Sequence, residues 1–308
     1  MPGSMGVKAI MTRDDAGVQR RPLGESLREY GRGVAGGLLF SIPLLYTMEV
    51  WWRGFTADPE ILLAYLLLSY LLLLGYNRYG GMHRSADFRE VAIESMEEMG
   101  LGLLISAAIL FLLGRITMEM PLQEVLGKII IEAMMVAIGV SVGTAQLGSG
   151  GKNQNGMDDQ SDESGESGQE DQNTQKRQPH PWGQLVLGFC GAVLIASNVA
   201  PTEEIVMIGL EATPSKLLGL AVLSILLCTL ILFYSGFVAS EIHVRGDAPF
   251  WIAYGVVTSY GLALVASALM LWFFGRFQGQ PFPVMVSQVV VLALPAALGA
   301  SAGRLLIQ

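Results

Sequence analysis

Glu132 is the residue whose surroundings in the sequence point most directly to chemistry. It lies near the middle of an apolar stretch and shares one helix face with Lys128 and Glu124, four and eight residues before it. An ionisable side chain in hydrocarbon costs about 2.5 to 3.5 kcal/mol on insertion scales, so it needs a partner or a purpose. Glu132 is therefore either a binding site for a proton or a cation, or half of a buried ion pair with Lys128 that orders helix packing.

Two further glutamates, Glu49 and Glu204, each follow a proline (Pro43 and Pro201) that can interrupt a helix and free backbone carbonyls. Hard cations prefer carboxylate and carbonyl oxygens, and interrupted membrane helices are where transporters commonly place such groups. The pair thus predicts a binding site for a cation whose identity stays open. The alternative is that both glutamates are wetted at the membrane surface. Further oxygen ligands would come from three neighbours: Asn198, Thr202 and Glu203.

A third group of acids precedes another apolar stretch and consists of Glu94, Glu97 and Glu98, with Glu90 one turn earlier. These residues could form a vestibule that attracts cations. They could also form a solvated helix start, where carboxylates are favoured near the positive end of the helix dipole. We favour the solvated helix start.

The elements that must hold these residues are membrane-spanning helices. Of the 308 residues, 52% are hydrophobic and 15% are charged, and the mean hydropathy is +0.47, which excludes an ordinary soluble domain. The hydrocarbon core of a bilayer is about 30 Å thick and a helix rises about 1.5 Å per residue, so roughly 20 apolar residues make one span. Eight stretches fit: 33–52, 60–77, 92–114, 122–147, 184–207, 214–240, 249–275 and 284–307.

The chain contains the same sequence unit twice. Residues 33–72 match residues 188–227 without a gap, and GLGLLISAAILFLLGR from Gly100 matches GLALVASALMLWFFGR from Gly261. The glutamates that follow a proline fall at the same position of the two units. Such repeats in apolar sequences are typical of transporter-like membrane folds. We therefore predict an all-α polytopic membrane protein of about eight transmembrane helices, built from two parallel, non-inverted four-helix repeats.

The matching also shows what the two repeats share and where they differ. Small residues at matching positions predict close contacts between helices. They are Gly139, Ser141 and Gly143 in the first repeat, and Gly299, Ser301 and Gly303 in the second. Glu132 falls opposite Leu292, so its role is not shared by the second repeat.

The remaining stretches give the domain boundaries and the orientation. Residues 1–32 are predicted to be a cytoplasmic tail, and the repeats occupy 33–148 and 182–308. Residues 149–181 are rich in Gly, Ser, Gln and acids and poor in apolar residues, so they predict a disordered cytoplasmic linker. Most of the 19 Lys and Arg lie in the tail, in this linker and in loops on the same side, which places both termini in the cytoplasm.

Several functions find no support in the sequence. The apolar stretches contain no His and no pair of Asp, and the chain has no HExxH motif, no nucleophile elbow and no nucleotide-binding fingerprint. We therefore predict that the protein is not an enzyme, that it uses no cofactor and that it binds no nucleic acid. The expected partners are the lipid bilayer and, for a transporter, an inorganic cation and a proton.

Two segments carry a resemblance to a known family. FSIPLLYTMEVWW, from Phe40 to Trp52, and SNVAPTEEI, from Ser197 to Ile205, resemble a group of bacterial integral membrane proteins that is known only as a family of unknown function. The resemblance covers both repeats and implies a location in the bacterial inner membrane. It implies no activity and assigns no site residue.

The glutamates and the repeats together predict a secondary cation transporter, with or without coupling to protons. Glu49, Glu204 and Glu132 would alternately hold a cation or a proton while the repeats rock against each other. One alternative is a non-transporting membrane scaffold or subunit that uses its polar groups for packing. Another is a passive cation channel that uses the same acids without coupling.

Overall fold

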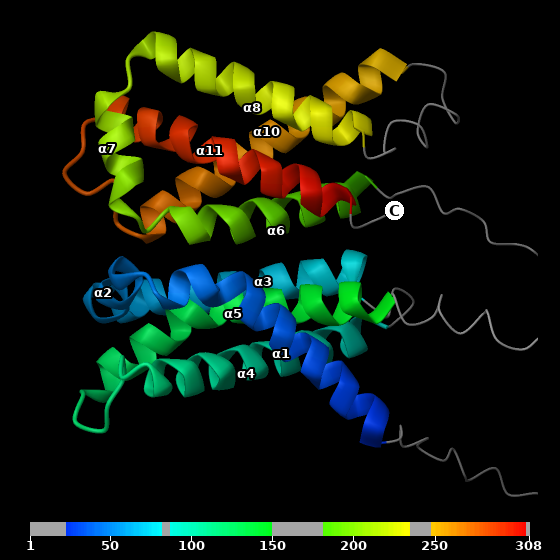
Figure 1. The fold of residues 1–308 in the computed structure, drawn as a ribbon, viewed down its shortest axis with the longest axis vertical. Helices are drawn as coiled ribbons and strands as arrows, with labels where there is room; N and C mark the ends of the chain where they lie inside the picture. Colours follow the sequence, from blue (N-terminus) through cyan, green and yellow to red (C-terminus); the bar gives the residue numbers. More distant parts are fainter. Residues whose placement is uncertain (1–22, 82–86, 150–180, 235–247, 306–308) are drawn as a thin grey trace, which may run out of the picture.

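The computed structural model describes residues 23–81, 87–149, 181–234 and 248–305 (Figure 1), and every regular element in these ranges is a helix. In chain order the helices are α1 (Leu23–Leu45), α2 (Met48–Thr56), α3 (Pro59–Gly80), α4 (Phe88–Leu112), α5 (Leu122–Ser149), α6 (Pro181–Val199), α7 (Glu203–Glu211), α8 (Pro214–Tyr234), α10 (Ala248–Phe273) and α11 (Phe282–Leu305). Seven of them are long and apolar enough to cross a membrane, and α1 with α2 forms an eighth, bent candidate. This agrees with the predicted all-α chain of about eight spans. Most of the predicted tail and linker lies outside the described residues.

Two of the predicted spans, 33–52 and 184–207, are interrupted, as the prolines at positions 43 and 201 predicted that they could be. α1 and α2 meet at an angle of 85°, and residues 200–202 separate α6 from α7. Pro43 lies in the last turn of α1 and Pro201 lies between α6 and α7. A proline removes one backbone donor and crowds the preceding turn, which favours a break at these places.

Threonine hydroxyls satisfy backbone carbonyls at both breaks. Thr47 Oγ1 donates to the carbonyl oxygen of Pro43 at 2.6 Å, and Thr202 Oγ1 donates to that of Val199 at 2.9 Å. The last carbonyls of a helix have no partner within the helix, and an unsatisfied one is costly in an apolar environment. The two hydroxyls therefore allow the chain to turn at these breaks.

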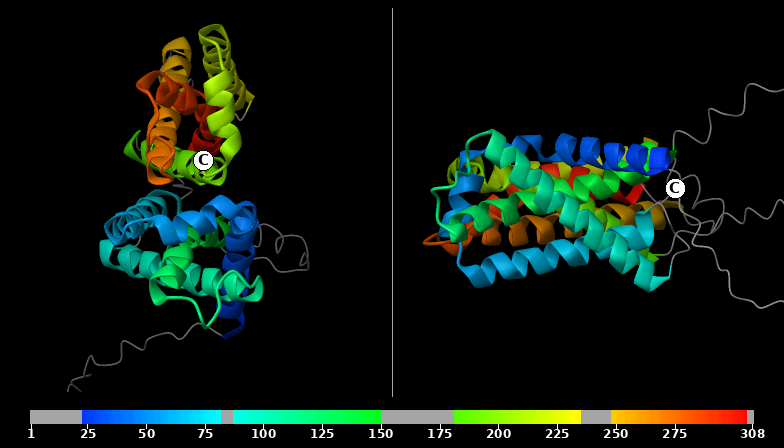
Figure 2. Two further views of the ribbon diagram at one scale, coloured as in Figure 1. Left: turned by 90° about the vertical axis from the view of Figure 1, so that its left-hand side faces the viewer. Right: turned by 90° about the horizontal axis from the view of Figure 1, so that it is seen from below.

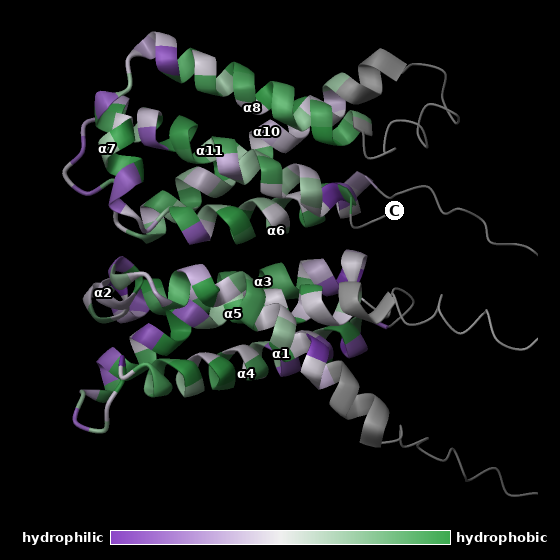
Figure 3. Ribbon diagram, viewed as in Figure 1, coloured by the Kyte–Doolittle hydropathy of each residue, from purple (hydrophilic) through white to green (hydrophobic). Residues whose placement is uncertain are grey.

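The helices form two groups that lie side by side, α1 to α5 and α6 to α11 (Figures 1 and 2). In the first group α5 is packed against α1, α2, α3 and α4, and in the second α11 is packed against α6, α7, α8 and α10. The short helices α2 and α7 lie at one end of the molecule, the loop end (left in Figure 1), and the outer ends of α1 and α11 lie at the other, the terminal end. Hydrophobic residues cover the lengths of the helices and hydrophilic residues gather toward both ends (Figure 3), as a bilayer requires.

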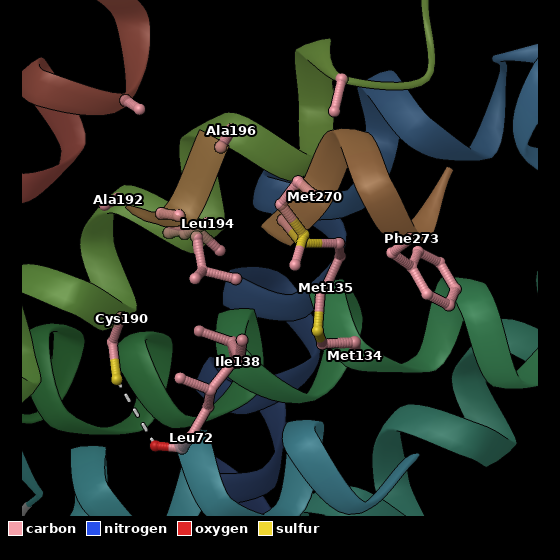
Figure 4. Close-up of a cluster of buried hydrophobic side chains, with 14 of the residues drawn as sticks. Leu72, Met134, Met135, Ile138, Cys190, Ala192, Leu194, Ala196, Met270 and Phe273 are labelled. Atoms are coloured by element: carbon pink, nitrogen blue, oxygen red, sulfur yellow. Dashed lines mark hydrogen bonds between the residues drawn. The ribbon is translucent and has the colours of Figure 1, made fainter. Parts of the chain in front are cut away.

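The boundary between the groups is formed mainly by α3 and α6 and is filled by apolar side chains, among which sulfur-containing residues lie beside leucine, isoleucine and alanine (Figure 4). The Cys190 thiol lies 3.5 Å from the carbonyl oxygen of Leu72, and the Ser197 hydroxyl lies 2.7 Å from the sulfur of Met135. Cys190 is a free, buried cysteine. Among the described residues only a few polar contacts cross this boundary, so apolar packing makes up most of the contact between the groups.

Glycines bring the central helix of each group into backbone contact with its neighbour. A Cβ at Gly36 of α1 would clash with the carbonyl of Gly139 in α5, and a Cβ at Gly191 of α6 would clash with the carbonyl of Gly299 in α11. Small residues allow this approach, and the resulting van der Waals contact holds membrane helices together. The predicted contacts through small residues are confirmed at these positions.

Candidate functional site

Glu132 is completely buried in α5, and neither oxygen of its carboxyl group has a hydrogen-bond partner among the described residues. Lys128 pairs with Glu124 instead, at 2.6 Å between Nζ and Oε1, and also donates to the carbonyl oxygen of Arg115 at 3.1 Å. The predicted alternative of an ion pair between Glu132 and Lys128 is therefore not what the structure shows. Glu132 remains a carboxyl group without a partner in the part of the chain that is described.

Glu132 lies where the two groups of helices meet. Residues three and four positions apart share a helix face, and Met135 and Val136 show what this face contacts. Met135 touches Ser197 of α6, and Val136 packs against Gly37 of α1. The Glu132 carboxyl group lies close enough to Tyr65 of α3 for its charge to act on that side chain. One turn nearer to the terminal end, the same face of α5 contacts α1 and α6.

The facing part of α1 is close to the break in that helix. α1 and α5 run antiparallel with Gly37 against Val136, so one turn further along both helices Ser41 comes level with Glu132. Ser41 is fully buried, and its hydroxyl donates a long hydrogen bond of 3.5 Å to the carbonyl oxygen of Leu38 within α1. Glu132 therefore lies beside a helix that loses its regular hydrogen bonding one turn later.

The glutamates predicted to form a cation site begin the two short helices at the loop end. Glu49 is half-buried in the first turn of α2, and Glu203 and Glu204 are exposed in the first turn of α7. All three act on the guanidinium of Arg276, in the loop that connects α10 and α11. Burial lowers the pKa of Arg276, and the negative charges of Glu49, Glu203 and Glu204 oppose that shift. The three acids thus act on the charge of one arginine, although none of them forms an ion pair with it among the described residues.

Arg276 changes what these acids can do, because it supplies a positive charge where the sequence suggested a bound cation. Within the described ranges, no group of three or more His, Cys, Asp or Glu could hold a metal ion. The sequence did offer a signal for this arginine. The matching segments that begin at Gly100 and Gly261 both end in a Gly-Arg pair, and Arg276 belongs to the second of these pairs. Its electrostatic interaction with acids far away in the chain could not be predicted from that signal. A cation site at Glu49 and Glu204 stays a prediction.

The other predicted oxygen ligands are used mainly by the end of α6. Thr202 donates to the carbonyl of Val199, and Asn198 Nδ2 donates to the carbonyl of Leu194 at 2.8 Å. Asn198 Oδ1 is buried and has no partner among the described atoms. Of the predicted neutral ligands, the Asn198 oxygen is therefore the one left available inside the protein.

The acids at the start of α4 do not share one environment. Glu97 is exposed and Glu94 is half-buried, which fits the predicted solvated helix start. Glu98 is buried, and its Oε2 accepts a bond of 2.6 Å from Asn77 Nδ2 of α3. The interpretation as a solvated helix start therefore does not hold for Glu98.

Arg53 of α2 connects the two groups of helices at the loop end. Its Nε donates to the carbonyl oxygen of Phe273, the last residue of α10, at 2.7 Å, and its guanidinium lies 5.7 Å from the centre of the Phe273 ring. Tyr65 of α3 stacks on the same ring with centroids 3.9 Å apart. The arginine thus caps the C-terminal end of a helix in the other group, where a positive charge is favoured.

Replacing Arg53 by methionine is expected to destabilise the protein by about 1.5 kcal/mol, because a hydrogen bond from a charged donor is lost at a half-buried position. The measurement is thermal unfolding of the purified protein in detergent. Arg115→Met is the matched control, since the Arg115 guanidinium lies over Trp51 inside the first group, 4.8 Å from its ring centre. Equal losses for the two variants would contradict a role of Arg53 in joining the groups.

Comparison with known proteins places the chain in a family. Residues 29–307 match the family described as "Putative integral membrane protein (DUF2391)". Neither a curated protein nor a solved structure matches the chain. The match covers all the described helices from the second turn of α1 onward, including the seven to eight candidate spans. The chain therefore belongs to this family and is a multi-pass integral membrane protein.

Proposed function

We propose that the protein is a secondary cation transporter in which Glu132 binds the transported or coupled ion. The observation that carries the proposal is the fully buried Glu132 carboxyl group, which has no hydrogen-bond partner in the described part of the chain. An isolated carboxylate is very unfavourable in an apolar interior, so the group must carry a proton or lie beside a bound cation. Proton binding and cation binding would then compete at one residue, which is the basis of proton-coupled exchange.

The place of Glu132 supports the same proposal. Transporters commonly bind their ions near the middle of the bilayer, at the interface between two moving parts. Glu132 lies on the face of α5 that contacts α6 of the other group, through Met135 and Ser197. A small shift of one group against the other would change its access to either side of the membrane.

We further propose that the two groups of helices are two copies of one duplicated unit, related in parallel. Each group has a long helix, a short helix at the loop end and three more long helices in the same order. The close contact of Gly36 with Gly139 and that of Gly191 with Gly299 fall at matching positions. The excess of Lys and Arg at the terminal end supports an orientation with both termini in the cytoplasm of a bacterial cell.

The loop-end acids have a role of their own in this proposal. Glu49 and Glu204 come from different groups and act on the same Arg276. This arrangement links the two groups electrostatically at the loop end. Breaking and re-forming this link would open and close the loop end to ions. A bound cation would compete with Arg276 for these carboxylates.

A non-transporting membrane scaffold is the second candidate, and Arg276 favours it. If Arg276 neutralises Glu49, Glu203 and Glu204 permanently, these acids stabilise packing and bind no ion. A passive cation channel would use the same acids without coupling. The three functions differ in whether ions move and whether protons move with them.

The test is ion-dependent proton movement in proteoliposomes that contain a pH-sensitive dye, with Ca²⁺, Mn²⁺, Na⁺ and K⁺ offered in turn. The wild type is expected to move protons in exchange for at least one cation, and Glu204→Gln is expected to slow this exchange by altering the loop-end contact. Cation flux without proton movement would indicate a channel. No flux for any ion, from protein shown to be folded and inserted, would leave the scaffold as the better explanation.

A further inference from the structure

A second buried carboxyl group lies in the first group of helices, at Glu98 of α4. Its side chain is surrounded by three other buried polar residues from three helices. They are Asn77 of α3, Ser95 of α4 and Ser141 of α5, of which none is more than 2% exposed. Glu98 itself is 6% exposed. Such a cluster of neutral polar groups around one carboxyl group is unusual for a membrane-spanning region.

The hydrogen bonds of this cluster fix the orientation of the Asn77 amide. Its Nδ2 donates to Glu98 Oε2 at 2.6 Å and to Ser95 Oγ at 3.1 Å, and its Oδ1 accepts from the Ser141 hydroxyl. The Ser95 hydroxyl in turn donates to the carbonyl of Val91 at 2.8 Å. The amide thus presents its donor, and not its oxygen, to Glu98.

This orientation decides which ligand the cluster fits. A sodium or calcium ion needs several oxygens that point at it, but the amide oxygen of Asn77 already accepts from Ser141, and the nitrogen of Asn77 faces Glu98. A proton needs only one carboxyl oxygen, together with a neighbour that can form a hydrogen bond to the carboxyl group in its protonated and in its deprotonated state. Asn77 can do this, because an amide donor can bond to a carboxylate or to the carbonyl oxygen of a carboxylic acid.

The charged groups around Glu98 leave the carboxyl group without a compensating cation. On its own helix the neighbours are acids, with Glu97 adjacent and Glu94 one turn away. On the packed helices, Arg78 of α3 is exposed and Arg32 of α1 is half-buried, and α5 carries no charged residue within two turns of Ser141. Glu98 forms no ion pair with any described residue.

We propose that Glu98, held by Asn77, is a second proton-binding site of this protein, separate from Glu132 and nearer to the terminal end. Ser141 follows Glu132 by nine residues in α5, which corresponds to about 14 Å along the helix and to opposite helix faces. Two carboxyl groups in one group of helices would provide one proton site near the middle of the span and another nearer to the terminal end. The use of Glu98 in ion exchange rests on the proposed function, whereas proton binding by Glu98 does not.

The second group of helices has the opposite chemistry at the matching place. The residue that matches Glu98 is Ser259 of α10, and its hydroxyl oxygen accepts from Arg304 Nη1 at 3.2 Å. Arg304 also donates to the carbonyl of Gly255 and to Oε1 of Gln184. A buried arginine therefore lies where the first group has a buried acid, which confines the second proton site to the first group.

The test is infrared spectroscopy of the full-length protein in nanodiscs during a pH titration, reading the carbonyl band of protonated carboxylic acids. Glu98→Gln is expected to remove one titrating band, which Glu97→Gln and Glu132→Gln leave in place. Asn77→Leu keeps the carboxyl group but removes its hydrogen bond, so the same band should remain and move to higher wavenumber. The Asn77 variant also serves if Glu98→Gln does not fold.

Retention of every protonated-carboxyl band in Glu98→Gln would overturn the proposal, as would an unchanged band position in Asn77→Leu. This outcome is distinguishable from a failure of the proposed function. If the proposed function fails, the protein moves no ions but the infrared band of Glu98 is still expected. If Glu98 binds no proton, no band is lost in Glu98→Gln, while flux that depends on Glu132 is unchanged.

Discussion

Replacing Glu132 by glutamine is expected to abolish the proposed coupled ion flux, and replacing it by leucine is expected to abolish flux and to raise the free energy of unfolding by about 1–3 kcal/mol. Glutamine has almost the shape of glutamate but cannot bind a proton or neutralise a cation. Leucine also removes a buried polar group that has no partner in the described part of the chain. The measurements are flux in proteoliposomes and thermal unfolding in detergent, made on the same preparations.

The opposite signs of the two effects distinguish a functional Glu132 from a structural one. Glu124→Gln is the matched control on the same helix face, because Glu124 is partly exposed and pairs with Lys128. It should keep most of the flux and change stability by about 1 kcal/mol or less. Flux that persists in Glu132→Gln would remove this residue from the ion path. A lower melting temperature for Glu132→Leu would show that the carboxyl group stabilises the fold.

Valine in place of Gly191 is expected to destabilise the protein by about 3 kcal/mol or more, and valine in place of Gly36 should do the same. At each position a Cβ would meet the backbone of the partner helix, of α11 in one case and of α5 in the other. Backbone atoms cannot rotate away as the end of a side chain can, so the two helices must separate. Loss of the folded protein during detergent extraction and a lower melting temperature measure the effect.

Gly100 and Gly261 provide the control for this prediction, since no described atom lies within 4 Å of a Cβ added at either position. Alanine there should stabilise the protein by about 0.5–1 kcal/mol, because alanine has less freedom to lose on folding. An equal loss of stability from valine at Gly36 and at Gly100 would contradict the role of close backbone contact at Gly36, because only Gly36 has a neighbour that a Cβ would meet.

The sequence was sufficient to predict features that depend on nearby residues. Apolar length predicted the helices, and spacing predicted the glycine contacts of α5 and α11. The prolines at positions 43 and 201 predicted points where a span can be interrupted, and the helices do break there, but the size of the bend did not follow from them. The 85° bend depends on the packing of α2 against α5, where the backbone of Gly54 lies against Gly127, and such packing is not visible in the local sequence.

The candidate site was predictable only in part for a similar physical reason. The position of Glu132 within its span followed from the sequence. The sequence did not show whether Lys128 pairs with Glu124 or with Glu132, because this depends on the conformation of the lysine side chain, and in the structure Lys128 pairs with Glu124. Arg276 is affected by the charges of acids that precede it by more than 70 residues in the chain, and Asn77 donates a hydrogen bond to Glu98 from another helix. Contacts of this kind depend on how helices pack, which no spacing rule describes.

The contrast between backbone contact within each group and side-chain contact between the groups determines which parts of the protein can shift. Glycine backbones in van der Waals contact allow little sliding, so α1 with α5 and α6 with α11 behave as rigid pairs. Methionine and small side chains, by contrast, can change conformation while keeping their contact. Mechanical compliance is therefore concentrated between the two rigid pairs, and the face of α5 that carries Glu132 lies within that compliant layer.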